Sequence, residues 1–278
     1  MSDHVRGKSI VVTGAASGFG RLVSEKAAAR GARITCGDVR SDALQEAVAA
    51  IRGAGGVAQA VTADVTDIAQ MRALAAAAVE AFGAIDVMIN NAGVMPLAFY
   101  ADHARALEAW QRCIDINVKG VLHGIVAVHD QMMRQGRGHV INLSSIYGNA
   151  PVAGAAVYGA SKAAVNFLSE SLRVESRGKI KVTIVKPTGV PGTGLGAGIV
   201  NTAAIVGILA QNAAQFGALV EKLQAGALPA AQLDPERIEY VMLDPAFIAD
   251  QVIHAIDQPW GVSVGDITIR AAGDHYVL

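Results

Sequence analysis

The sequence predicts an α/β fold in which about seven parallel strands form a doubly wound sheet, within a single domain spanning residues 1–278. Three observations support this. Short apolar runs typical of strands buried on both faces alternate with helix-length segments along the chain. The chain is long enough for one large domain and, at 52% hydrophobic, can bury a sizeable core. Small or polar residues follow most predicted strands, at the sheet edge where such folds bind ligands.

The first half of the chain supplies four strands and three helices. The first strand contains the apolar run Ile10-Val11-Val12, and a glycine-rich segment then leads into an alanine-rich helix that ends near Gly31. Ser41 and Asp67 are natural N-caps for the next two helices. The predicted strands are 8–13, 33–37, 57–63 and 87–89, and the predicted helices end at residues 30, 54 and 82.

The second half continues the alternation. One helix, or two in succession, is predicted over 104–134, followed by a strand at 139–143, a helix over 157–176 and strands at 181–185 and 266–270. Between these last two strands lies a long segment, about 190–243, that is rich in Ala, Leu, Ile and Val. We expect it to form a helical substrate loop that closes over the ligand.

Composition argues against several functions. The formal net charge is −1 with both signs dispersed, so nucleic acid is not an expected partner. Cys36 and Cys113 lie far apart without ligand spacing, so we expect no disulfide and no metal site, and we expect both thiols to be buried. Residues 1–8 are polar and contain no apolar signal region, which favours a cytoplasmic protein.

One apolar stretch, 199–220, invites comparison with a membrane span. The polar residues that interrupt it are Asn201, Gln211, Asn212 and Gln215. A spanning helix tolerates such groups poorly, so we expect a lid, core or subunit-contact helix and no membrane partner. An interfacial helix on a membrane surface stays open as an alternative.

Tyr158 and Lys162 lie four residues apart on one predicted helix, which places them on the same face. At an effective dielectric of about 20, an ammonium roughly 4–5 Å from a phenolate stabilises it by about 3–4 kcal/mol, or about 2–3 pKa units. Such a pair can hold a tyrosine that exchanges a proton near neutral pH. The pentapeptide alone also arises often by chance.

A glycine-rich loop, Gly14-x3-Gly18-x-Gly20, joins the first strand to its helix. Glycines let the backbone turn tightly and approach a pyrophosphate, whose charge the following helix N-terminus favours. The spacing is wider than in the common dinucleotide fingerprint. We expect this loop, with Ser17 and Phe19, to bind a dinucleotide cofactor.

Asp38 ends the second predicted strand, where a carboxylate can accept both adenosine ribose hydroxyls and repel a 2′-phosphate. Ser17 offers no cation for such a phosphate, so both residues favour NAD over NADP. Arg40 is a candidate phosphate ligand and keeps NADP open. After later strands, we expect Asp64-Val65 at the adenine and Asn90-Asn91 at the cleft, where the two amides can tie neighbouring strands together.

Together these motifs resemble the short-chain dehydrogenase/reductase family. Their order and spacing match, with Ser145 thirteen residues before Tyr158, over about 8–187 and weakly over 245–270. The matching elements are Thr13-Gly14-x3-Gly18-x-Gly20, Asn90-Asn91-Ala92-Gly93, Asn117, Ser145 and Tyr158-x3-Lys162. The resemblance implies a Rossmann-like fold and hydride transfer between NAD(H) and an alcohol or ketone.

The resemblance also implies roles for individual residues. Tyr158 would be the general base in alcohol oxidation and the general acid in carbonyl reduction. Lys162 would bind the nicotinamide ribose and, with the positive nicotinamide ring, depress the phenol pKa. Ser145 would hydrogen-bond the substrate oxygen, and Asn117 would hold a water that connects Lys162 to solvent. Val190 would contact the nicotinamide carboxamide through its backbone.

The chain departs from the family pattern in three places. The usual Pro-Gly after the sixth strand is Pro187-Thr188 here, and Thr193 lies one place later than usual, so we assign it no role. Phe19 replaces the commoner aliphatic residue of the glycine loop. The segment 257–270 is closer to a subgroup resembling hydroxy-acid and serine dehydrogenases, which often uses NADP.

The apolar loop over 190–243 suggests an apolar secondary alcohol or ketone as substrate. We expect Met95, Ile146 and Tyr147 to line its pocket with Ser145 and Tyr158. The alternatives are NADP(H) with a hydroxy-acid or polar substrate, and a catalytically silent dinucleotide-binding protein. Because members of the family usually assemble through the helices before and at the catalytic residues, we expect a homotetramer or homodimer.

Overall fold

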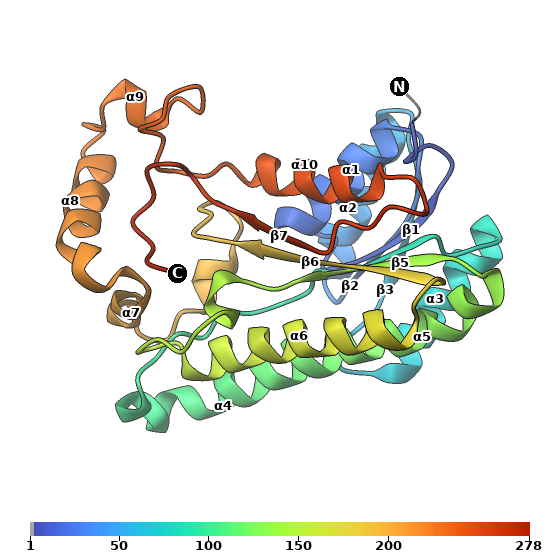
Figure 1. Ribbon diagram of the computed structural model, residues 1–278, viewed down its shortest axis with the longest axis horizontal. Coiled ribbons are helices and arrows are strands. Elements are labelled where there is room, and N and C mark those ends of the chain that lie inside the picture. Colours follow the sequence, from blue (N-terminus) through green and yellow to red (C-terminus); the bar gives the residue numbers. More distant parts are fainter. Residues whose placement is uncertain (1–2) are drawn as a thin grey trace.

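The computed structural model describes residues 3–278 and contains a seven-stranded sheet in which all paired strands are parallel (Figure 1). The strands lie in the spatial order β3-β2-β1-β4-β5-β6-β7. The first strand therefore lies inside the sheet, and later strands extend the sheet toward both edges. The predicted fold class and strand number are confirmed. The strands are β1 (Ser9–Thr13), β2 (Arg33–Asp38), β3 (Val57–Thr62), β4 (Val87–Asn90), β5 (Gly138–Leu143), β6 (Ile180–Pro187) and β7 (Asp266–Ile269).

Helices cover both faces of this sheet (Figure 1). One face carries α1 (Gly18–Ala29), α2 (Ser41–Gly53) and α10 (Pro245–Ile256), and the other carries α3 (Ile68–Phe82), α4 (His103–Ile114), α5 (Gly120–Gln135) and α6 (Ala156–Glu175). The Asp67 carboxylate caps α3 by accepting from the Ala69 and Gln70 N–H groups, as predicted. Ser41 is not an N-cap, because α2 begins at Ser41 itself and Arg40 occupies the cap position.

The core has two apolar layers because successive strand residues point to opposite faces. Ile10 and Val12 of β1 pack with Ile34 under α1, α2 and α10. Val11, between them in the sequence, packs with Met88 on the opposite face. The continuous apolar run of the first strand therefore serves both layers, as expected for a strand covered on both sides.

The helical region predicted over 104–134 forms two helices joined by a π-helical turn, Asp115–Lys119. This turn contains Asn117, the residue assigned to the catalytic set. Just after it, α5 packs closely on the sheet, and a Cβ atom at Gly124 would collide with Asn90 Oδ1. The polar ends of β4 and the π turn are thus held close together.

The long substrate loop projects from the carboxyl edge of the sheet and contains α7 (Val206–Leu209), α8 (Ala213–Gln224) and α9 (Ala230–Leu233) (Figure 1). By length and composition alone, Thr202–Gln224 could cross a membrane, and 17% of an apolar 18-residue window within it is buried. It is not one regular helix. Two 3-10 turns accompany α7 and α8, and the chain breaks direction at Ala210, whose φ of 46° is unusual for a residue with a Cβ atom.

Candidate functional site

The predicted site residues converge on one cleft at the carboxyl ends of the strands, with a volume of about 1180 Å³. Loops after six strands contribute to it, and the substrate loop closes one side. The sequence-predicted residues that line it are Gly14, Ser17, Gly18, Phe19, Asp38, Asp64, Val65, Asn91, Met95, Ser145, Ile146, Tyr147, Tyr158, Lys162 and Val190. Gly20 and Asn117 do not line it and lie behind its wall.

The glycine loop has the backbone conformation that its sequence predicts. Gly14 and Gly18 have φ values of 66° and 54°, in the left-handed region that favours glycine. A Cβ atom at Gly20 would collide with the Gly14 carbonyl oxygen, so Gly20 allows helix α1 to start close beneath the loop. This cradle and the N-terminus of α1 fit a pyrophosphate.

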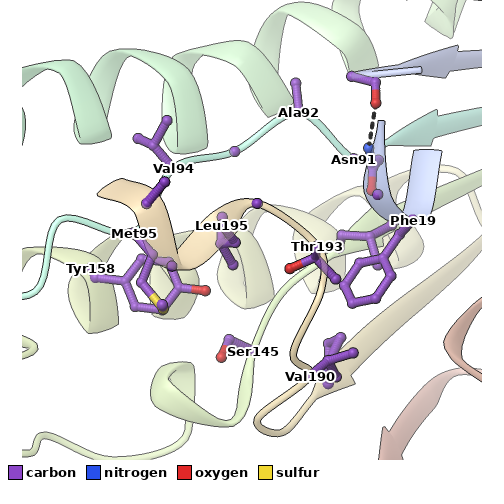
Figure 2. A pocket seen from close by; sticks show the side chains of 18 of the residues that line it. Phe19, Asn91, Ala92, Val94, Met95, Ser145, Tyr158, Val190, Thr193 and Leu195 are labelled. Atoms are coloured by element: carbon purple, nitrogen blue, oxygen red, sulfur yellow. Dashed lines mark hydrogen bonds between the residues drawn. The ribbon is translucent and has the colours of Figure 1, made fainter. Parts of the chain in front are cut away.

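The two asparagines at the end of β4 tie it to both neighbouring strands, as predicted. Asn91 Nδ2 donates to the carbonyls of Thr13 (2.9 Å) and Gly14 (3.2 Å), next to the glycine loop (Figure 2). Asn90 Nδ2 donates to Asn142 Oδ1 of β5 at 2.8 Å. These bonds fix the loops after β1, β4 and β5 relative to one another.

Asp38 carries a buried carboxylate at the end of β2. Its Oδ2 accepts from the Ala16 N–H at 3.1 Å, and its Oδ1 accepts from the Arg40 N–H at 3.0 Å. The Arg40 guanidinium also binds this carboxylate and donates to Ser17 Oγ at 2.8 Å. Arg40, which we considered as a candidate ligand for a 2′-phosphate, therefore links Asp38 to the glycine loop.

Tyr158 and Ser145 meet where β5 ends and α6 begins. Both are buried and both side chains face the cleft (Figure 2). Lys162 Nζ lies 5.8 Å from the centre of the Tyr158 ring and donates to the Leu143 carbonyl at 2.8 Å. The helix spacing thus brings phenol and ammonium together, with the serine hydroxyl of the neighbouring turn beside them.

Burial dominates the electrostatics of this pair. It raises the pKa of Tyr158 above its ordinary value, while the hydrogen bond to Ser145 acts in the opposite direction. It lowers the pKa of Lys162 to about 8. In the protein chain alone, burial outweighs the hydrogen bond with Ser145, and the lowering of the phenol pKa by Lys162 together with the nicotinamide ring stays a prediction.

Asn117 is fully buried and binds the loop after β4 with both polar atoms of its side chain. Oδ1 accepts from the Val94 N–H, and Nδ2 donates to the Val94 carbonyl, each at 2.9 Å. Nδ2 also lies 3.0 Å from Ser161 Oγ on α6. The side chain therefore positions the backbone next to Lys162, whereas its role in holding a water stays a prediction.

The loop after β6 closes against the glycine loop. The Thr193 carbonyl oxygen lies 3.1 Å from the position that a Gly18 Cβ atom would take, and Figure 2 shows Thr193 beside Phe19. Phe19 and Val190 pack against the same core cluster. Thr193, to which we assigned no role, thus helps enclose the end of the cleft that contains the glycine loop.

Two features of the cleft were not predicted from the sequence. The α8 helix turns an apolar stripe toward it, consisting of Phe216, Leu219, Val220 and Leu223. Its spacing of three, four and seven residues was a readable helical signal. Tyr276 also lines the cleft, from a tail whose sequence contains no motif that predicts this position.

No metal site is evident within residues 3–278, where no group of three or more His, Cys, Asp or Glu side chains could hold an ion. A nicotinamide dinucleotide fits the cleft. Its pyrophosphate would lie on the glycine cradle and its adenosine ribose at Asp38, and Lys162 would meet the nicotinamide ribose.

The sequence matches the short chain dehydrogenase family over residues 8–225. It is 36% identical over 191 residues to the 2,5-dichloro-2,5-cyclohexadiene-1,4-diol dehydrogenase LinX of Sphingobium indicum, covering 68% of this chain and 75% of that protein. A short chain dehydrogenase/reductase from Burkholderia phymatum in complex with NAD superposes with a TM-score of 0.75 and 29% identity, over 96% of this chain and 90% of that one. The closed form of a serine dehydrogenase complexed with NADP+ gives a TM-score of 0.74 and 26% identity, over 94% and 93%.

Proposed function

The chain belongs to the short-chain dehydrogenase/reductase family and is an oxidoreductase, and on that premise we propose that it transfers hydride between NAD(H) and an apolar secondary alcohol or ketone. The observation that carries the proposal is the convergence of Ser145, Tyr158 and Lys162 at one end of a cleft whose other end holds Asp38. The nicotinamide, when bound, supplies or accepts the hydride.

The chain's own residues supply position and proton transfer. In the reducing direction, Tyr158 Oη donates its proton to the substrate oxygen, and the Ser145 hydroxyl donates a hydrogen bond to the same oxygen as negative charge develops on it. In the oxidising direction, Tyr158 takes the alcohol proton. Lys162, held by the Leu143 carbonyl, favours the deprotonated tyrosine when the ammonium is charged.

Two arguments support NAD over NADP. The buried Asp38 carboxylate would repel a 2′-phosphate, and Arg40 already binds that carboxylate. Similar proteins occur in complex with either cofactor, so the choice has to come from these residues. The alternative is that Arg40 leaves Asp38 and binds the phosphate, which would allow NADP(H).

An apolar substrate is supported by the stripe on α8, where Leu219 and Val220 are only partly buried and face the cleft. Closure of α8 over an apolar ligand would bury this stripe further, and removing apolar area from water is favourable. A similar protein, LinX, is named for a chlorinated cyclohexadiene diol.

We further propose that the enzyme is a cytoplasmic homodimer or homotetramer. The thiols of Cys36 and Cys113 are free and buried, which fits a reducing compartment. Exposed apolar side chains form rows with helical spacing on the adjacent helices α4, α5 and α6, namely Leu107, Ile114, Leu122, Val126, Phe167 and Val174. A second copy of the chain could cover this apolar face by pairing equivalent helices about a twofold axis.

A substrate screen tests the proposed function. Purified protein is incubated with apolar secondary alcohols and their ketones, with NAD and NADP in parallel, while the absorbance of the reduced cofactor is followed. Turnover with an NAD preference is expected. Cofactor binding without turnover of any substrate would instead favour the catalytically silent protein, and a preference for hydroxy acids with NADP would favour the polar alternative.

A further inference from the structure

The C-terminal tail runs back over the carboxyl edge of the sheet, between the sheet and the substrate loop (Figure 1). Two hydrogen bonds tie it to that loop: the Val277 N–H donates to the Ile208 carbonyl, and Asn212 Nδ2 donates to the His275 carbonyl, each at 3.0 Å. The tail is therefore part of the cleft wall, and it holds α7 and the N-cap of α8 in place.

Arg270, just beyond β7, anchors the same tail to the sheet. Its Nη2 donates to Asp274 Oδ1 and to the Tyr276 carbonyl, both at 2.6 Å, and its Nε donates to Asp274 Oδ2 at 3.1 Å. The Asp274 side chain is 4% exposed and the Arg270 side chain is 42% exposed, so the carboxylate is shielded while the guanidinium reaches solvent. Tyr276 is thus held from both sides.

The Tyr276 ring reaches from the tail to the floor of the cleft. Its hydroxyl lies so close to the backbone of Gly189 that a Cβ atom there would collide with it. Its ring centre is 6.2 Å from that of Phe216 on α8. Glycine at position 189, next to the altered Pro187-Thr188 pair, therefore makes room for the phenol.

A second phenol, that of Tyr147, lies on the same side of the cleft. Its ring packs edge-on against Tyr158, with centres 5.4 Å apart at 71°. Within residues 3–278, neither the Tyr147 hydroxyl nor the Tyr276 hydroxyl has a hydrogen-bond partner, although both side chains are largely buried. Neither hydroxyl oxygen is itself fully buried, so both open onto the cleft, where each can donate a hydrogen bond to a ligand oxygen.

Burial keeps both phenols protonated. It raises the pKa of Tyr276 to about 12, and it raises the pKa of Tyr147 above its ordinary value. Both can therefore donate a hydrogen bond at neutral pH. Of the described residues that line this part of the cleft, those after β5, after β6, on α8 and in the tail include no charged side chain. A carboxylate or phosphate would find no counter-ion among these residues, and Lys162, which also lines the cleft, already donates to the Leu143 carbonyl.

We propose that Tyr276 and Tyr147 form a second-oxygen site, which binds a neutral hydroxyl or carbonyl oxygen of the substrate away from the reacting carbon. The inference rests on the proposed function and narrows its substrate class to apolar hydroxyketones and the matching diols. Tyr276 is a specificity-determining residue supplied by the tail.

Matched ketones test the proposal. The kcat/KM of the full-length enzyme is measured with cyclohexanone and with 2-, 3- and 4-hydroxycyclohexanone, and the quantity compared is the ratio of each hydroxyketone to cyclohexanone. At least one ratio should exceed one in the native enzyme. It should fall about fivefold to tenfold in Tyr276→Phe and in Tyr147→Phe, because each substitution removes one hydrogen-bond donor and leaves the ring.

Tyr100→Phe is the matched control, since Tyr100 is 73% exposed and lies outside the cleft. Its ratios should equal those of the native enzyme. Turnover of cyclohexanone with no preference for any hydroxyketone, or with ratios unchanged by Tyr276→Phe, would overturn the second-oxygen site and leave the proposed function standing. A changed KM for the cofactor with unchanged ratios would overturn it too, by assigning Tyr276 to the nicotinamide carboxamide. Absence of turnover with every ketone in this set and in the wider substrate screen would overturn both.

Discussion

Arg40 folds back onto Asp38, with its Nε 3.2 Å from one carboxylate oxygen and its Nη2 3.2 Å from the other. The same Nη2 lies 2.8 Å from Ser17 Oγ on the glycine loop. The carboxylate is buried whereas the Arg40 side chain is 55% exposed, so solvent can reach the guanidinium but not the carboxylate. We therefore expect the choice between NAD and NADP to depend on whether Arg40 stays on Asp38 or turns to a 2′-phosphate.

Asp38→Ala should lower the preference for NAD over NADP by about tenfold to a hundredfold, because it removes the ribose acceptor and releases Arg40. The measurement is kcat/KM for both cofactors with one substrate. The double variant Asp38→Ala/Arg40→Ala is the control. Its kcat/KM with NADP should lose the increase seen in Asp38→Ala, and its kcat/KM with NAD should stay low. A native enzyme that already prefers NADP would contradict our interpretation of Asp38.

Tyr158→Phe should lower turnover by at least about a hundredfold, because the ring still packs but the hydroxyl that exchanges the substrate proton is gone. Binding of NADH, followed by its fluorescence, should be retained. Tyr100→Phe again serves as the control, since it removes a phenol hydroxyl on the surface. Near-normal turnover in Tyr158→Phe would rule out the proposed mechanism.

Lys162→Met should stabilise the fold more at pH 7 than at pH 9.5. Burial lowers the pKa of Lys162 to about 8 in the folded protein from about 10.5 in the unfolded chain. Between these values the unfolded chain binds more protons, so this lysine's contribution to the free energy of unfolding rises with pH. At pH values below the folded-state pKa, burying the charged lysine lowers the free energy of unfolding by about 3 kcal/mol, and the substitution removes this cost.

Urea unfolding of both proteins at the two pH values measures this difference. The lost hydrogen bond to the Leu143 carbonyl affects both conditions and cancels in the comparison. Lys222→Met, on the exposed face of α8, is the control and should show no such pH dependence. An equal or larger stabilisation at pH 9.5 would show that the charged form of Lys162 does not destabilise the folded protein.

Much of the fold and cleft could be predicted because the necessary signals are local in sequence. Strand ends, the Tyr158–Lys162 spacing and the glycine loop each depend on a few neighbouring residues. The effect of burial on the Tyr158 pKa could not be predicted, because desolvation depends on what the fold packs around the phenol. The position of Tyr276 could not be predicted either, since it arises from tail contacts with Ile208 and Asn212, more than sixty residues earlier in the chain.

Phe167→Glu should produce a smaller species than the native protein in size-exclusion chromatography with light scattering. Phe167 is 78% exposed in the row on α6, and a carboxylate there would be buried without a partner in the proposed subunit contact. Ile238→Glu is a matched control, because Ile238 is equally exposed but lies outside α4, α5 and α6. A monomeric native protein, or the same mass for both variants, would contradict the proposed interface.

Leu219→Gln should raise the KM for an apolar ketone about tenfold and leave cofactor affinity unchanged. Leu219 faces the cleft within the apolar stripe of α8, so closure over the substrate would bury the new amide where its hydrogen bonds are lost. Ala218→Gln places the same side chain on the neighbouring, exposed position of α8 and should leave both constants as they are. KM for the ketone and the cofactor Kd are measured for all three proteins. If the cofactor Kd changes in Leu219→Gln while the ketone KM does not, then α8 serves the cofactor half of the cleft rather than the substrate.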